Sequence, residues 1–127
     1  MLKTERVARL GLLDDQDSPR VLPVTFALAD GVIYSAIDSK PKRSSEPARV
    51  RYLRRRPEAA LTVDHYADNW AELAWVQVLV RVELLDRDEQ GLAALTAKYD
   101  QYRSEPPPGP VLRLVPERAL HWRADAA

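Results

Sequence analysis

A block of basic residues between Lys40 and Arg56 is the part of this sequence best suited to bind an anion. It contains one acid, Glu46, and eight basic residues: Lys40, Lys42, Arg43, Arg49, Arg51, Arg54, Arg55 and Arg56. The block is therefore +7 (eight minus one), and the rest of the chain is −7 because the whole has 19 basic and 19 acidic residues. Such a block indicates a partner bearing phosphate, carboxylates or a nucleic-acid backbone, or else the solvated face of an arginine-rich helix.

Several chemistries are excluded by residues that the sequence lacks. The chain has no cysteine, which rules out disulfides, cysteine-ligated zinc, iron–sulfur clusters and thiol catalysis. Its two histidines are too few for a histidine-rich metal site, so we expect no metal. Dinucleotide, P-loop, nucleophile-elbow and zinc-protease motifs are missing. With four glycines and no glycine-rich loop, phosphate must be held by basic side chains and a helix N-terminus.

Composition and length predict one soluble domain over residues 1–127. The sequence is 46% hydrophobic and 30% charged, and no apolar run approaches the roughly 20 residues of a membrane helix. The first residues, MLKTERVAR, lack the apolar core of a signal peptide, so we expect a cytoplasmic protein without a membrane partner. Nucleic acid is also not an expected partner, because the domain is neutral overall and Tyr52 is the one aromatic residue in the basic block.

Hydrophobic periodicity and turn residues predict the elements that would position the basic block. Three strands joined by tight turns are expected as an antiparallel meander, over Arg6–Leu13, Val21–Ala29 and Val32–Ile37. Pro23 places the second of these at a sheet edge or a bulge. Further strands are expected over Leu61–Tyr66 and Trp75–Leu85, and a last one over Val111–Val115 and Ala119–Arg123, broken at Pro116.

Two helices complete the predicted order βββ-α-ββ-α-β. The first begins near Ser44, with a serine cap and Pro47 in its first turn, and runs to about Arg55 with Val50 and Leu53 facing inward. The second covers Asp88–Tyr102, and the proline-rich segment Glu105–Pro110 follows it as a linker. The sequence therefore predicts a mainly β, α+β domain: a small barrel with helices packed over its openings.

Five segments resemble the pyridoxamine 5′-phosphate oxidase-like family, and most closely its coenzyme F-420-dependent group. They are VARL (Val7–Leu10), VLPVTFAL (Val21–Leu28), VIYSAIDSKPKR (Val32–Arg43), VDHYADNW (Val63–Trp70) and AKYDQYRSEPPPGPV (Ala97–Val111). The resemblance extends from the first strand to the last. It implies a homodimeric split β-barrel of the FMN-binding type, with about six antiparallel strands and two or three helices.

The resemblance also implies which residues hold the cofactor. Ser35 matches a strand-end hydroxyl that contacts the cofactor phosphate, and Arg49 matches a basic residue at the start of the following helix. Lys40, Lys42 and Arg43 match a basic loop of the F-420 group. Pro23, Val24 and Thr25 match the strand that lies along the flavin ring. Trp75 matches a residue near that ring, with ordinary core or dimer packing as the alternative. Each basic residue could instead face solvent.

The activity implied is hydride transfer between reduced coenzyme F-420 and a small organic substrate. His65 and Tyr66 are the candidates for a proton donor, although a histidine at a strand end is more often a hydrogen-bonded structural residue. An FMN-binding oxidoreductase of the same fold and a non-catalytic carrier of the cofactor remain as alternatives, since the same phosphate-binding residues would serve each.

Overall fold

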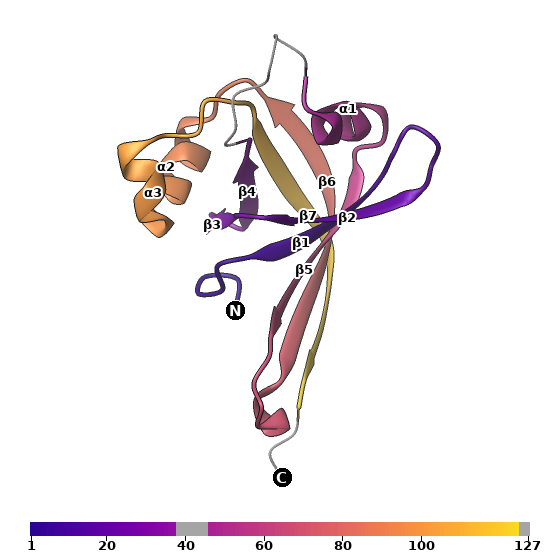
Figure 1. Cartoon of the computed structure of the whole chain (residues 1–127), viewed down its shortest axis with the longest axis vertical. Coiled ribbons are helices and arrows are strands. Elements are labelled where there is room, and N and C mark those ends of the chain that lie inside the picture. The colour runs from indigo at the N-terminus through magenta and orange to yellow at the C-terminus, as the bar shows by residue number, and fades with distance from the viewer. Residues whose placement is uncertain (38–45, 125–127) are drawn as a thin grey trace.

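The computed structural model describes residues 1–37 and 46–124, in which seven strands form one antiparallel sheet (Figure 1). The strands are β1 (Ala8–Leu13), β2 (Pro19–Val24), β3 (Ala27–Ala29), β4 (Val32–Ala36), β5 (Glu58–His65), β6 (Ala74–Leu85) and β7 (Val111–Arg123). The helices are α1 (Ala48–Arg55), α2 (Glu89–Lys98) and α3 (Asp100–Ser104), with a short 3-10 turn η2 (Trp70–Glu72). The predicted mainly β class is confirmed, with seven strands where about six were expected.

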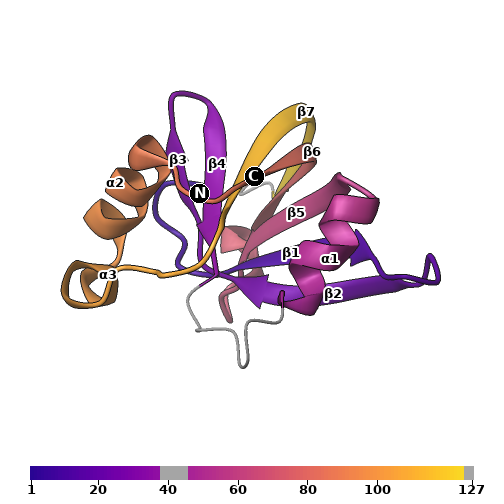
Figure 2. The same ribbon diagram turned by 90° about the horizontal axis from the view of Figure 1, so that it is seen from above.

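The strand order β2-β1-β5-β6-β7-β4-β3 differs from the predicted meander. The apolar run Val21–Ala29 is not one strand, because it divides at Thr25 and Phe26 into β2 and β3, which lie at opposite edges of the sheet. These two residues therefore carry the chain from one edge to the other, and the sheet curls, as seen from above in Figure 2. Pro23 lies in edge strand β2, as predicted, where a missing N–H costs no inner hydrogen bond.

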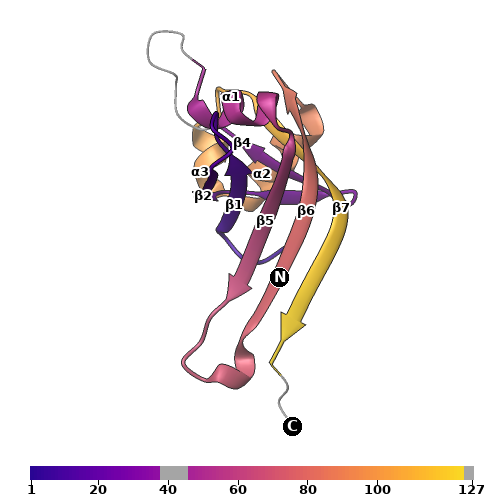
Figure 3. The same ribbon diagram turned by 90° about the vertical axis from the view of Figure 1, so that its right-hand side faces the viewer.

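Strands β5, β6 and β7 run side by side and extend beyond the rest of the sheet (Figure 3). β6 alternates as predicted, with Val78, Val80 and Val82 buried and Arg81 and Glu83 exposed. The predicted break at Pro116 was wrong, because β7 continues through it. A register shift at Leu79/Val80 accommodates the proline, and β4 pairs with Val111 to Leu114 and not with Pro116.

The main core fills the inside of the curled sheet and is covered at one opening by α1. Leu10, Phe26, Leu61 and Leu114 are fully buried there, together with Leu53 of α1. Val50 and Leu53 face inward as predicted. The helix start differs: Pro47 is the N-cap residue rather than part of the first turn, and its cap has no side-chain hydrogen bond. The predicted serine cap falls on Ser44, which lies outside the described residues.

A second, smaller core joins α2 and α3 to strands β3 and β4. It contains Ala27, Tyr34, Ala36, Leu95, Tyr102 and Val111. Gly91 allows α2 to approach β4 closely, because a Cβ at that position would lie 2.6 Å from the ring of Tyr34. The single helix predicted over Asp88–Tyr102 was wrong: Tyr99, with extended φ −116° and ψ 116°, separates α2 from α3. Within the described residues, no helix is long and apolar enough to span a membrane.

Candidate functional site

A small groove of about 180 Å³ lies where β2 leaves the sheet and α1 begins. We call it the Arg49 groove, and it is lined by Val7, Pro23, Val24, Thr25, Ala36 and Arg49. Pro23, Val24, Thr25 and Arg49 were predicted to bind the cofactor, so the fold brings Arg49 next to residues that lie 24 to 26 positions before it in the sequence. The basic side chain supplies charge, and the end of edge strand β2 supplies backbone polar groups.

Arg49 differs from the other arginines of α1 because those arginines are engaged in ion pairs within the chain. Arg51 pairs with Asp15 at 3.0 Å, Arg54 with Glu46 at 2.7 Å, and Arg55 with Asp17 at 2.8 Å. No carboxylate partner of Arg49 occurs among residues 1–37 and 46–124. Its guanidinium is therefore available to a ligand in the Arg49 groove.

Arg51 and Arg55 join α1 to the β1–β2 turn, whereas Arg54 pairs with Glu46 just before the helix. The Arg55 guanidinium holds the pKa of the Asp17 carboxyl below its ordinary value, mainly through a hydrogen bond, and Arg54 does the same for Glu46. Arg56 also contacts Asp17, at 3.3 Å. The helical half of the basic block is thus largely neutralised, which supports the solvated-helix interpretation for Arg51, Arg55 and Arg56.

Ser35 does not line the Arg49 groove but is hydrogen-bonded to Thr25, which does. It is 1% exposed, and its hydroxyl donates a 2.7 Å hydrogen bond to the carbonyl oxygen of Thr25. In this conformation the hydroxyl holds the β2–β3 corner in place and is not open to a ligand. Lys40, Lys42 and Arg43, also predicted to bind the cofactor, lie outside the described residues.

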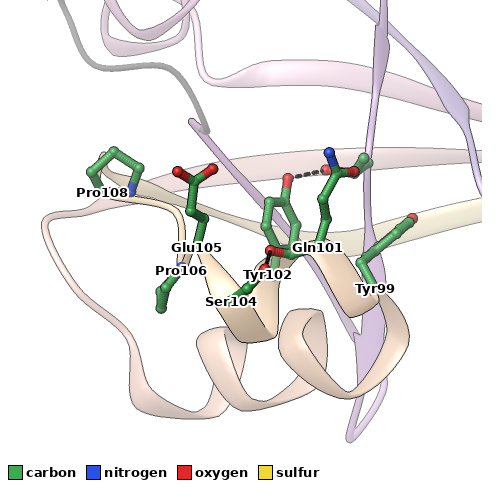
Figure 4. Close-up of a pocket in the computed structure, with 8 residues that line it drawn as sticks. Tyr99, Gln101, Tyr102, Ser104, Glu105, Pro106 and Pro108 are labelled. Atoms are coloured by element: carbon green, nitrogen blue, oxygen red, sulfur yellow. Dashed lines mark hydrogen bonds between the residues drawn. The ribbon is translucent and has the colours of Figure 1, made fainter.

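A larger pocket of about 550 Å³ shares Thr25 with the groove and is otherwise formed around α3 (Figure 4). We call it the α3 pocket, and it is lined by Thr25, Tyr99, Gln101, Tyr102, Ser104, Glu105, Pro106 and Pro108. The hydroxyls of Thr25 and Tyr102 are 2.7 Å apart and hydrogen-bonded. Of these lining residues, only Thr25 was predicted as a site residue. The segment AKYDQYRSEPPPGPV carried the family resemblance alone, although its tyrosines and the glutamate beside its prolines were a usable signal.

Tyr99 fixes the β2–β3 corner that the groove and the pocket share. Its hydroxyl accepts a 3.0 Å hydrogen bond from the Phe26 N–H and lies 2.9 Å from the carbonyl oxygens of Phe26 and Arg6, to either of which it can donate. Burial raises the pKa of this phenol. The Lys98 ammonium lies 3.6 Å from the centre of the Phe26 ring, and burial lowers its pKa to about 8.

The remaining predicted residues lie away from the Arg49 groove, on the extension of β5, β6 and β7. His65 ends β5, with its Nδ1 3.8 Å from a Glu5 carboxylate oxygen, and Tyr66 is 66% exposed. Trp75 pairs across the sheet with Trp122, and both rings are partly exposed. Within one chain, then, neither His65 nor Trp75 lines the groove that holds Pro23, Val24 and Arg49.

The sequence from residue 1 to 123 matches the family model described as pyridoxamine 5′-phosphate oxidase. The chain belongs to the pyridoxamine 5′-phosphate oxidase family. This match spans both the Arg49 groove and the α3 pocket, so the family membership covers the whole candidate site. Among curated proteins, none matches the chain significantly.

Solved structures share the split β-barrel fold of the pyridoxamine 5′-phosphate oxidase family. A conserved hypothetical protein from Mycobacterium tuberculosis has a TM-score of 0.76 at 18% identity, over 95% of this chain and 79% of that one. A FAD-binding protein from Mesorhizobium loti has a TM-score of 0.71 at 22% identity, over 94% and 85%. A protein described as an F420 reductase has a TM-score of 0.69 at 17% identity, over 94% and 92%. The predicted split β-barrel is therefore confirmed.

Proposed function

We propose that this protein is an oxidoreductase that binds coenzyme F-420 with the cofactor phosphate at Arg49 and the ring along Pro23, Val24 and Thr25. The observation that carries the proposal is the Arg49 guanidinium, which lies beside the end of an edge strand and has no carboxylate partner within residues 1–37 and 46–124. A guanidinium forms strong charge-assisted hydrogen bonds with phosphate, and the polar backbone of an edge strand can bind the heteroatoms of a flavin-like ring. The groove thus fits the phosphate end of such a cofactor.

When bound, a flavin or deazaflavin supplies the hydride transfer, so the protein needs to position it and exclude water. Arg49 would fix one end of the cofactor, and the Thr25 position would lie between the cofactor and the α3 pocket. A substrate in that pocket would therefore be adjacent to the cofactor. The F-420 choice rests on the sequence segments named above and is consistent with the fold shared with an F420 reductase.

Parallel titration of the purified protein with coenzyme F-420 and FMN tests the choice of cofactor. Fluorescence anisotropy or quenching is expected to show micromolar binding of coenzyme F-420 and weaker binding of FMN. Micromolar binding of FMN with none of the deazaflavin would instead establish an FMN protein of the same fold. Tight cofactor binding without reduction of any substrate by the loaded protein would identify a carrier.

We also propose a homodimer in which a second copy completes the cofactor site. A volume of about 180 Å³ is below the roughly 300–1,000 Å³ of sites that enclose small molecules, so one chain covers only part of a flavin-sized ligand. The extension of β5, β6 and β7 also exposes large aromatic side chains: Tyr66 and Trp70 at 66% and 69%, and Trp75 and Trp122 at 37% and 46%. Exposed aromatic clusters of this kind mark interaction surfaces.

Size-exclusion chromatography with light scattering is expected to give a mass near twice 14.4 kDa. Replacing Trp75 and Trp122 together by serine is expected to shift the equilibrium toward monomer, because it removes apolar area from the proposed contact surface. Exchanging Val21 for serine, an exposed residue on β2, serves as the control and should leave the mass unchanged. A clean monomer at micromolar concentration would contradict the shared site.

A further inference from the structure

The α3 pocket carries a negative charge that the described part of the chain does not neutralise. Glu105 follows α3, and its carboxylate extends to the same side as the Tyr102 and Gln101 side chains (Figure 4). Among residues 1–37 and 46–124, the Glu105 carboxylate has no ion-pair or side-chain hydrogen-bond partner. The other lining residues among those that the structure describes are neutral, so Glu105 sets the sign of the charge that these residues give the pocket.

Two arginines close to the lining residues are bonded to other partners: Arg103, next to Ser104 in sequence, and Arg6, which lies 5.6 Å from the Tyr99 ring centre. Arg103 pairs with Asp100 at 2.8 Å and donates to the carbonyl oxygens of Thr96 and Ala97 at 3.1 Å. Arg6 donates to the carbonyl oxygen of Lys98. Neither guanidinium lines the α3 pocket, so a bound anion would meet the Glu105 carboxylate without a compensating charge from these arginines.

The walls of the pocket suit a small ring. Pro106, Pro108 and the Tyr99 ring provide apolar surface, whereas the Gln101 and Ser104 side chains provide polar groups. Its volume of about 550 Å³ is in the range of small-molecule sites. Because Thr25 lines both the α3 pocket and the Arg49 groove, a ligand here would lie next to one in the groove.

We propose that the α3 pocket binds an organic cation: a flat or compact apolar body with a basic nitrogen that reaches the Glu105 carboxylate. The cation would pair with Glu105 while its apolar body packs against Pro106, Pro108 and Tyr99. The proposal rests on the proposed function only in identifying this ligand as the substrate. The binding of the cation itself requires no cofactor.

Three ligands of one size but different charge test the proposal: benzamidine, benzamide and benzoate. Their affinities for the cofactor-free protein are measured by titration calorimetry and by amide chemical shifts of Gln101 and Ser104 in NMR. We expect benzamidine to bind about 5- to 10-fold more tightly than benzamide, since a charge-assisted hydrogen bond at an exposed carboxylate is partly screened by solvent. Benzoate is expected to bind more weakly than benzamide.

Glu105→Gln removes the charge with little change of shape and is expected to reduce benzamidine affinity to that of benzamide. Glu72→Gln, at the far end of the β5–β6 hairpin, removes the same charge elsewhere and should change nothing. Glu105→Lys is expected to reverse the preference toward benzoate. Equal binding of benzamidine and benzamide, no benzamidine binding, or an unchanged affinity in Glu105→Gln would each overturn the proposal. Failure of coenzyme F-420 to bind would overturn the proposed function and leave these outcomes intact.

Discussion

Replacing Arg49 by alanine is expected to weaken cofactor binding by about 1–3 kcal/mol, or about 5- to 150-fold, as for other charge-assisted hydrogen bonds to phosphate. The expectation follows from the contrast within α1, where Arg51, Arg54 and Arg55 have carboxylate partners and Arg49 instead lines the groove. Fluorescence titration with whichever cofactor binds the unaltered protein measures the loss. Added salt should reduce the difference between the two proteins, because it screens exposed charges.

Arg54→Ala is the matched control, because it removes the same guanidinium from the same helix. Arg54 is paired with Glu46 on the exposed side, so its loss should leave cofactor affinity unchanged. Equal losses in the two variants would indicate a general effect of positive charge. An unchanged affinity in Arg49→Ala would show that the cofactor phosphate does not bind at the Arg49 groove.

Replacing Phe26 by alanine is expected to lower the free energy of unfolding by about 3–5 kcal/mol, the range for a buried phenylalanine. The Phe26 side chain is fully buried in the main core. Its backbone N–H donates a hydrogen bond to the hydroxyl of Tyr99, the residue between α2 and α3. The substitution removes the ring from the corner where the chain crosses from one sheet edge to the other. Urea denaturation followed by tryptophan fluorescence gives the difference.

Val21→Ala, in neighbouring strand β2, provides the comparison, since Val21 is 69% exposed and its truncation should cost no more than about 0.5 kcal/mol. A loss below about 1.5 kcal/mol for Phe26→Ala would show that the core readily fills the space left by the ring. Cofactor affinity in this variant should also fall, because Thr25 adjoins Phe26 and lines the Arg49 groove.

The sequence predicted the character of each element better than the way the elements meet. The alternation of Val78, Val80 and Val82 in β6 was sufficient to assign that strand and its buried face. The division of Val21–Ala29 into strands at opposite edges could not be predicted, because both halves are apolar and no turn residue separates them. Tyr99 likewise fits a helical pattern, and its extended backbone depends on contacts with Phe26 and Arg6, far away in the sequence.

In the candidate site, too, contacts between segments far apart in the sequence could not be predicted. The basic block is evident from the sequence, because its residues are close together along the chain. Its pairing with Asp15 and Asp17 could not be predicted, because these residues reach Arg51 and Arg55 from the distant β1–β2 turn. Position relative to the family segments was more informative, because it grouped Arg49 with Pro23, Val24 and Thr25, and the fold brings these together. The α3 pocket was missed because its shape depends on the break at Tyr99.

The strand order also determines when each part of the sheet can form during synthesis. β1 pairs locally with β2, and β3 with β4, so both hairpins can form early. The other neighbour of β4 is β7, the last strand. Ile33 can therefore pair with Leu114 only after β7 has been synthesised. Until then the buried face around Tyr34 lacks Val111, although α2 and α3 precede β7 in the chain. A nascent chain that stalls before β7 would therefore present this early hairpin as an open edge, the form most prone to aggregate or to engage a chaperone.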